Sequence, residues 1–99
     1  MKQNLLPENF DFEKGAPLWI LHPDRKLIER QFTFKDFLQA FEFMTLSAQY
    51  AEEINHHPDW SNSWNRVKVI LTTHSSGGLT NLDVLMAQKM NDVAKDLLV

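Results

Sequence analysis

The chain contains no cysteine among its 99 residues, which excludes a disulfide framework and a thiolate metal site. It also has no apolar run near the roughly 18 residues that a membrane span requires. Its start, MKQNLLPENFDFEK, lacks the apolar core of a signal peptide. We therefore expect a cytoplasmic protein that does not contact a membrane.

Clustered positive charge and glycine are scarce as well. The net charge is -3 and no patch of Lys and Arg stands out, so direct nucleic-acid binding is not expected. With only three glycines, four prolines and 43% apolar residues, the composition is that of a folded protein. A chain of this length buries one core, so residues 1–99 are expected to form a single domain.

Two segments near the start favour β-structure, Pro17–Leu21 and Lys26–Thr33. Between them Pro23 and Asp24 suit a tight turn, which predicts a hairpin. Further on, DWSNSW alternates Trp60, Asn62 and Trp64 with polar residues. The run RVKVILTTH alternates more strongly, which predicts a strand that ends at His74.

Two helices are expected to begin at the same motif, Thr-x-x-Asp, in which a hydroxyl and a carboxylate cap the first turn. The motif occurs at Thr33 with Asp36 and at Thr80 with Asp83, and the first helix should run to about Asn55. The apolar stripe predicted to cover the sheet comprises Phe34, Phe37, Phe41, Met44, Ala48 and Ala51; a second comprises Phe43, Leu46, Tyr50 and Ile54; that of the final helix comprises Leu82, Met86, Met90, Val93 and Leu97.

The resulting order, β-β-α-β-β-α, predicts an α+β two-layer sandwich: a four-stranded, mainly antiparallel sheet with both helices on one face. A first helix that is apolar on two sides requires two partners, and we expect these to be the sheet and another subunit. The alternative is that loops or the N-terminal segment cover its second face.

Three histidines, His56, His57 and His74, are placed at predicted element ends, where functional groups are often mounted. Pro58 disfavours helical backbone at His57, so the helix should finish around His56 and the two rings should diverge. A returning strand would bring His74 beside them. Imidazole suits proton transfer near neutral pH. The alternatives are that the pair caps the helix, or that the three rings hold a metal, although adjacent histidines aim poorly at one ion.

Neighbouring residues allow similar alternatives. Glu52 precedes His56 by four residues and can orient its imidazole, or it is a solvated surface charge. Asp83 is first of all a helix cap. Trp60 and Trp64 can stack on a planar ligand, or they pack in the core or at an interface.

The run EEINHHPDWSNSWNRVKVILTTH, followed by GLT and DVLMA, resembles the signature of the pterin-4a-carbinolamine dehydratase family. The similarity extends upstream through RQFTFKDFLQAFEFMT and covers the chain from about Trp19 onward. The matching positions are Glu52, His56, His57, Pro58, Trp64, Thr73, His74, Asp83 and Ala87.

This resemblance implies the same element order and a hydro-lyase activity, that of 4a-hydroxytetrahydrobiopterin dehydratase. Members remove water from 4a-hydroxytetrahydropterin, the product of aromatic amino acid hydroxylases, to give quinonoid dihydropterin in tetrahydrobiopterin recycling. They use neither a metal nor an organic cofactor, and they form homodimers and homotetramers. Animal members also serve as dimerisation cofactors of a homeodomain transcription factor, so a regulatory cofactor with a vestigial dehydratase site is the alternative function, and a metal-binding module is the third.

On the family pattern, His56 and His74 are the acid and base, in either order, His57 positions the pterin and Glu52 supports His56. The residues implied to contact the pterin are Asn55, Pro58, Trp64, Thr72, Thr73, Ser75 and Asp83. Two departures stand out. Family members often have Asp where this chain has Asn55, and many begin with a helix that the segment NLLPENFDFEKGA, broken by Pro7, would shorten or remove.

Overall fold

A computed structural model describes residues 3–98 of the chain. Within that range the elements follow the predicted order, with a short α1 (Phe12–Gly15) before them and a 3-10 turn, η1 (His74–Ser76), before the last helix. The strands are β1 (Ile20–Leu21), β2 (Ile28–Thr33), β3 (Asp59–Ser63) and β4 (Arg66–Leu71), and the long helices are α2 (Phe37–Ile54) and α3 (Asn81–Leu97).

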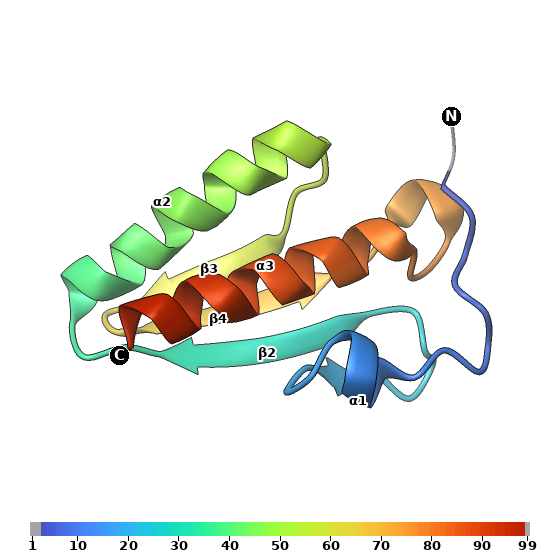
Figure 1. The fold of residues 1–99 in the computed structure, drawn as a ribbon, viewed down its shortest axis with the longest axis horizontal. Helices are drawn as coiled ribbons and strands as arrows, with labels where there is room; N and C mark the ends of the chain where they lie inside the picture. Colours follow the sequence, from blue (N-terminus) through green and yellow to red (C-terminus); the bar gives the residue numbers. More distant parts are fainter. Residues whose placement is uncertain (1–2, 99) are drawn as a thin grey trace.

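The four strands described in residues 3–98 form one antiparallel sheet in the order β1-β2-β4-β3. Both long helices pack over one face of this sheet, so the predicted α+β sandwich is confirmed (Figure 1). The side chains of β4 alternate as predicted, with Val67, Val69 and Leu71 buried under the helices. The expected hairpin also forms, but β1 is only two residues long because Leu18 adopts a left-handed φ of 74° just before it.

The prediction for the start of α2 was wrong. Thr33 still belongs to β2, where it pairs with Arg66, and Asp36 is the N-cap instead. The Asp36 carboxylate accepts a hydrogen bond of 2.9 Å from the backbone N–H of Gln39. An N-cap needs extended backbone, and Asp36 has it with φ -157° and ψ 179°.

The face that α2 turns to the core also differs from both predicted stripes. Phe37 and Phe41 of the first stripe are exposed, whereas Phe43 of the second is fully buried. Its ring lies 4.6 Å from that of Phe32 and 5.0 Å from that of Phe34, measured between centroids. The buried residues of α2 are Ala40, Phe43, Ser47 and Ala51. Small residues at three of these four positions let the helix lie close to its neighbours, a feature that hydrophobicity alone does not predict.

The last helix agrees with its prediction. Thr80 and Asp83 form the expected capping box. Met86, Met90 and Val93 of the predicted stripe are buried, while Leu82 and Leu97 at its two ends are half-buried. The start of α3 is therefore fixed by polar contacts, and these contacts form part of the candidate site.

A polar contact attaches the β1 side of the sheet to α3. Asn91 of α3 accepts through Oδ1 from Trp19 Nε1 at 2.8 Å and from an Arg30 guanidinium nitrogen at 2.5 Å. The same guanidinium lies 4.2 Å from the centre of the Phe32 ring. Partial burial lowers the pKa of Arg30 from its ordinary value, but a guanidinium remains charged at any physiological pH.

Candidate functional site

His56 lies just after α2, and the way this helix ends sets its position. Asn55 has left-handed backbone, φ 51° and ψ 47°, and its N–H bonds the Glu52 carbonyl at 3.4 Å. The N–H of His56 then bonds the Ala51 carbonyl at 3.0 Å, which completes a Schellman motif. The helix therefore ends at Ile54 with Asn55 as its C-cap, close to the predicted end at about Asn55, and the left-handed backbone of Asn55 ends it before Pro58 is reached. Asn and Asp both tolerate this backbone, so the departure at Asn55 preserves the turn.

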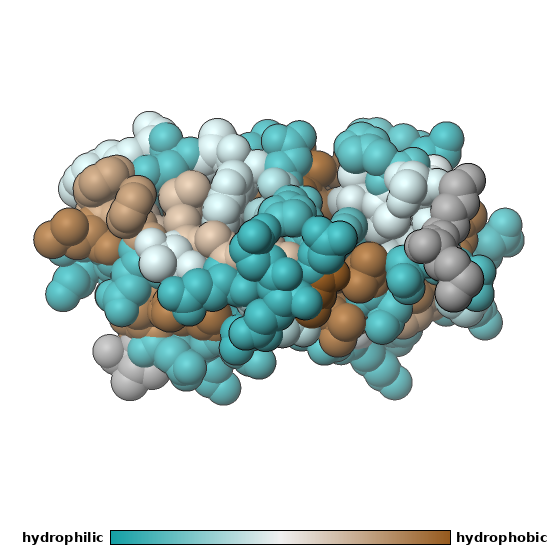
Figure 2. Space-filling view, turned by 90° about the horizontal axis from the view of Figure 1, so that it is seen from above, coloured by the Kyte–Doolittle hydropathy of each residue, from teal (hydrophilic) through white to brown (hydrophobic). Residues whose placement is uncertain are grey.

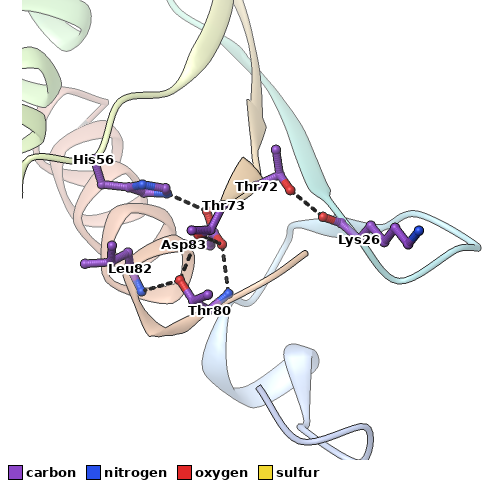
Figure 3. Close-up of polar contacts among 7 residues, drawn as sticks. All are labelled: Lys26, His56, Thr72, Thr73, Thr80, Leu82 and Asp83. Carbon is purple, nitrogen blue, oxygen red and sulfur yellow. Dashed lines mark hydrogen bonds and ion pairs between the residues drawn. The ribbon is translucent and has the colours of Figure 1, made fainter. Parts of the chain in front are cut away.

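The imidazole of His56 is directed into the protein. Its side chain is only 10% exposed, and Nε2 lies 2.6 Å from Oδ1 of the fully buried Asp83 (Figure 3). An ionised carboxylate can only accept hydrogen bonds, so Nε2 carries the proton in this pair. Nδ1 is then the ring nitrogen that does not face Asp83.

Asp83 is held from three directions. Its Oδ2 accepts from the Thr73 hydroxyl at 2.8 Å and from the Thr80 backbone N–H at 2.9 Å. The hydroxyls of Thr73 and Thr80 lie 2.8 Å apart. Asp83 also sits in the first turn of α3, where the helix dipole stabilises a negative charge. The carboxylate is thus fixed in place, and it fixes the orientation of His56.

His57 forms a second histidine–carboxylate pair beside the first. Its Nε2 lies 2.5 Å from Oε2 of Glu52, and both side chains are exposed. The prediction that Glu52 supports His56 was wrong, since the Schellman turn directs His56 inward and presents His57 to Glu52. The two rings diverge, as predicted from the Pro58 position.

His74 begins η1 immediately after Thr73 and is exposed. Because Thr73 bonds the same carboxylate as His56, the backbone of His74 starts one residue from the network. This places His74 at the same end of the sheet as His56 and His57. The meeting of all three rings around one ligand stays a prediction. The strand that was expected to reach His74 ends at Leu71, because Thr73 turns back to pair with Gly78.

The remaining predicted residues divide into two groups. Asn55, Pro58 and the exposed Ser75 lie next to the histidines in the chain. Thr72 directs its hydroxyl away from the network, to the Lys26 carbonyl at 2.6 Å, as Figure 3 shows. Trp64 does not join the site within one chain.

Trp64 lies in the turn between β3 and β4, at the opposite end of the hairpin from His57. A strand of this length separates the two ends by roughly 17 Å. Trp64 is 65% exposed and has a left-handed φ of 50°, an uncommon backbone for a large side chain. The Asn62 amide holds this turn by donating to the carbonyls of Trp64 and Arg66 at 3.0 and 2.9 Å.

Sequence reasoning missed the role of Thr80 in the network and the pairing of His56 with Asp83, which are 27 positions apart. The Thr-x-x-Asp motif was a signal for the cap, but it gave no sign that the same carboxylate would face a histidine. Within residues 3–98, no group of three or more His, Asp or Glu side chains is arranged to hold a metal ion, and no helix is long and apolar enough to cross a membrane.

Comparison with known proteins gives consistent matches over most of the chain. A relative from Bordetella avium with the provisional name pterin-4-alpha-carbinolamine dehydratase is 47% identical over 95 residues, 95% of this chain and 88% of that protein. One from Brucella ovis with the same provisional name is 53% identical over 76 residues, 77% of this chain and 78% of that protein.

Solved structures extend the match to the fold. The crystal structure of a transcriptional coactivator/pterin dehydratase from Brucella melitensis has a TM-score of 0.84 at 46% identity and covers 92% of this chain and 99% of its own. A pterin dehydratase-like protein identified as a RuBisCO assembly factor in the alpha-carboxysome has a TM-score of 0.65 at 19% identity, over 77% of this chain and 88% of its own, which shows a shared fold alone. The family model described as pterin 4 alpha carbinolamine dehydratase matches residues 4–93. The chain belongs to this family.

Proposed function

We propose that this protein is a 4a-hydroxytetrahydropterin dehydratase that works by histidine acid/base catalysis. The reaction removes the 4a-hydroxyl as water and the proton on N5, and the product is the quinonoid dihydropterin. One proton must be delivered to the leaving oxygen and another removed from N5, so two groups that exchange protons near neutral pH are sufficient. His56 and His74 are this pair in the proposal, and His57 positions the ring and stabilises the cationic transition state.

The observation that carries the proposal is the buried network of His56, Asp83 and Thr73. Holding a carboxylate without solvent is costly unless it is paired, so this arrangement is more than a helix cap requires. It gives His56 a fixed tautomer with Nδ1 free for the substrate. A carboxylate that orients a catalytic imidazole serves the same purpose in other acid/base enzymes.

The activity can be tested with freshly formed substrate. An aromatic amino acid hydroxylase generates the 4a-carbinolamine, and ultraviolet absorbance follows its dehydration with and without this protein. We expect a faster decay that a chelator does not slow. An unaccelerated decay would refute the activity, and acceleration lost on chelation would indicate a metal instead.

The residue assignment is tested by comparing histidine variants in that assay. His56→Ala and His74→Ala together should lower the rate by about 100-fold or more, since general acid and base groups contribute 10² to 10⁴. His22→Ala is the matched control, because His22 pairs with Asp24 at 2.9 Å in the exposed β1–β2 turn. Equal losses in both variants would contradict the assignment.

The partners in this proposal are the pterin, the hydroxylase that supplies it in the cytoplasm, and further copies of the chain in a homodimer or homotetramer. The outer face of α2 supports the last of these, since Phe37, Leu38, Phe41 and Leu46 are all exposed. Seen from the side on which α2 lies, apolar groups gather at the end where this helix begins (Figure 2). A face of this kind usually marks an interaction site.

A regulatory role remains the second candidate function. The same face of α2 favours this role because it could also bind another protein.

The role of this face as an interface between copies can be tested at Leu38. Leu38 is 77% exposed, so Leu38→Glu should leave the fold intact. Light scattering should then show a smaller oligomer than the wild type, while Lys35→Glu, an exposed change just before α2, should not alter the mass. If Leu38→Glu leaves a wild-type oligomer intact, this face is not the interface between copies.

A further inference from the structure

The N-terminal residues Gln3–Leu6, here called the strap, run alongside the segment that carries His74. This segment, Thr73–Thr80, is called the His74 loop. The Ser76 hydroxyl donates to the Gln3 carbonyl at 2.6 Å, and the Leu6 N–H donates to the Leu79 carbonyl at 2.9 Å. The second of these bonds belongs to an antiparallel bridge between Leu5 and Thr80 (Figure 1, right). Two hydrogen bonds therefore join the strap to the His74 loop.

The His74 loop is closed at its base and open at its tip. Thr73 and Gly78 exchange backbone hydrogen bonds of 3.0 and 3.3 Å, and Gly77 turns the chain with a left-handed φ of 77°. The base is fixed further by the Thr73 hydroxyl on Asp83. The tip, His74–Gly77, lies outside this fixed base, and Ser76 is the tip residue whose side chain bonds the strap.

The strap also packs against the base of the loop. Leu5 Cδ2 lies so near Gly78 that a Cβ placed there would be only 3.2 Å away. A cavity of about 670 Å³ is shared by the strap, the loop and the β1–β2 turn, and its lining includes Leu5, Leu6, Asp24, Lys26, Gly77 and Gly78. The hairpin approaches the loop as well, through the Thr72 hydroxyl on the Lys26 carbonyl and through Lys26 Cγ, 4.0 Å from a Cβ placed at Gly78. The strap, in contrast, bonds the tip of the loop at Ser76.

We propose that the strap positions His74 for catalysis and that Ser76 is the positioning residue through which it acts. The inference rests on the proposed dehydratase function. His74 starts the 3-10 turn that ends at Ser76, and the Gly77 N–H bonds its carbonyl at 3.0 Å. Anchoring Ser76 therefore fixes the turn that aims the imidazole. The strap overlaps the start of NLLPENFDFEKGA, the segment in which the family resemblance predicted a reduced or missing helix.

Ser76→Ala tests this directly. We expect kcat to fall about three- to tenfold, which is the effect that the net free energy of one hydrogen bond produces. KM should stay within about twofold of the wild-type value because His56 and His57 are unchanged. Hydrogen exchange at the Gly77 and Gly78 amides should accelerate while α3 stays protected. Ser76→Thr keeps the hydroxyl and should restore both, and Ser63→Ala, an exposed serine in β3, is the matched control.

Removing residues 1–4 deletes the Gln3 carbonyl, which is the acceptor of the Ser76 hydrogen bond. This truncation should reproduce the Ser76→Ala effect, and combining the two should cost no more than either alone. Unchanged exchange in both variants, faster exchange with unchanged kcat, or full additivity would each overturn the inference. An inactive wild type would instead refute the dehydratase function, and the exchange data would still decide whether the strap holds the loop.

Discussion

His56 and His57 are neighbours in the chain, and each pairs with a carboxylate at almost the same distance. The His56–Asp83 pair measures 2.6 Å, and the His57–Glu52 pair measures 2.5 Å. Their environments are opposite, since the side chains of the first pair are 10% and 0% exposed and those of the second are 56% and 78% exposed. Distance alone therefore says little about what either pair contributes.

The difference lies in what surrounds each carboxylate. Asp83 has both oxygens occupied, by His56 and by Thr73 and Thr80, and its side chain is fully buried. Glu52 meets His57 in water, where salt and side-chain entropy reduce the gain to a small value. The buried pair should set the geometry of the site, and the exposed pair should adjust it. A third pair, His22–Asp24 in the β1–β2 turn, lies outside the site and offers a reference.

The largest effect is expected from breaking the buried pair. Asp83→Ala should lower the free energy of unfolding by about 3 kcal/mol, because it leaves His56, the Thr73 hydroxyl and the Thr80 N–H without their common partner. Urea denaturation followed by circular dichroism measures this. Activity should fall by about 100-fold as His56 loses its orientation.

Asp83→Asn serves as the companion variant, since it keeps the shape and removes the charge. We expect a smaller loss of stability, about 1–2 kcal/mol, so that the folded enzyme can still be assayed. If Asp83→Asn retains full activity, the carboxylate is only a helix cap and the network has no catalytic purpose.

The contrast between the pairs also separates the features that local sequence patterns predict from those that they do not. Element order, the Thr80–Asp83 cap and the location of the histidines at element ends depend on local patterns, and those patterns predicted them. The predicted start of α2 was wrong because Thr33 pairs with Arg66 in the sheet, and Asp36, three residues further on, caps the helix instead. Which residues pair across neighbouring strands cannot be predicted from a short stretch of sequence.

The partners of the histidines could not be predicted for the same reason. Spacing suggested Glu52 for His56, four residues apart on a helix. The left-handed backbone of Asn55 ends the helix before His56, so the helical spacing does not hold for this pair. Glu52 pairs with His57 instead. Asp83 reaches His56 only after α3 has packed beside α2, and no pattern along the chain encodes that contact.

Breaking the exposed pair should have an intermediate effect. Glu52→Gln should change the free energy of unfolding by less than about 1 kcal/mol, as is usual for an exposed ion pair. If Glu52 orients His57 toward the pterin, KM should rise about two- to fivefold with kcat nearly constant. Steady-state kinetics at low and high salt tests this, and the difference should shrink as salt screens the pair. A large fall in kcat would mean that Glu52 takes part in proton transfer.

The smallest effect is expected at the reference pair. The Lys26 backbone N–H, at 2.8 Å from Oδ1, and then His22 hold the pKa of Asp24 below its ordinary value of 3.8. A carboxyl group whose pKa is lower in the folded state stabilises the fold above its unfolded pKa, and that contribution disappears as the pH falls through the folded value. Asp24→Asn should therefore give a slightly lower Tm than the wild type near neutral pH, and the two melting temperatures should converge as the pH drops below 3.8. Thermal melts across this range measure the difference. Dehydration should be unchanged at neutral pH, and a loss there would mean that the β1–β2 turn supports the site through Lys26 and Thr72.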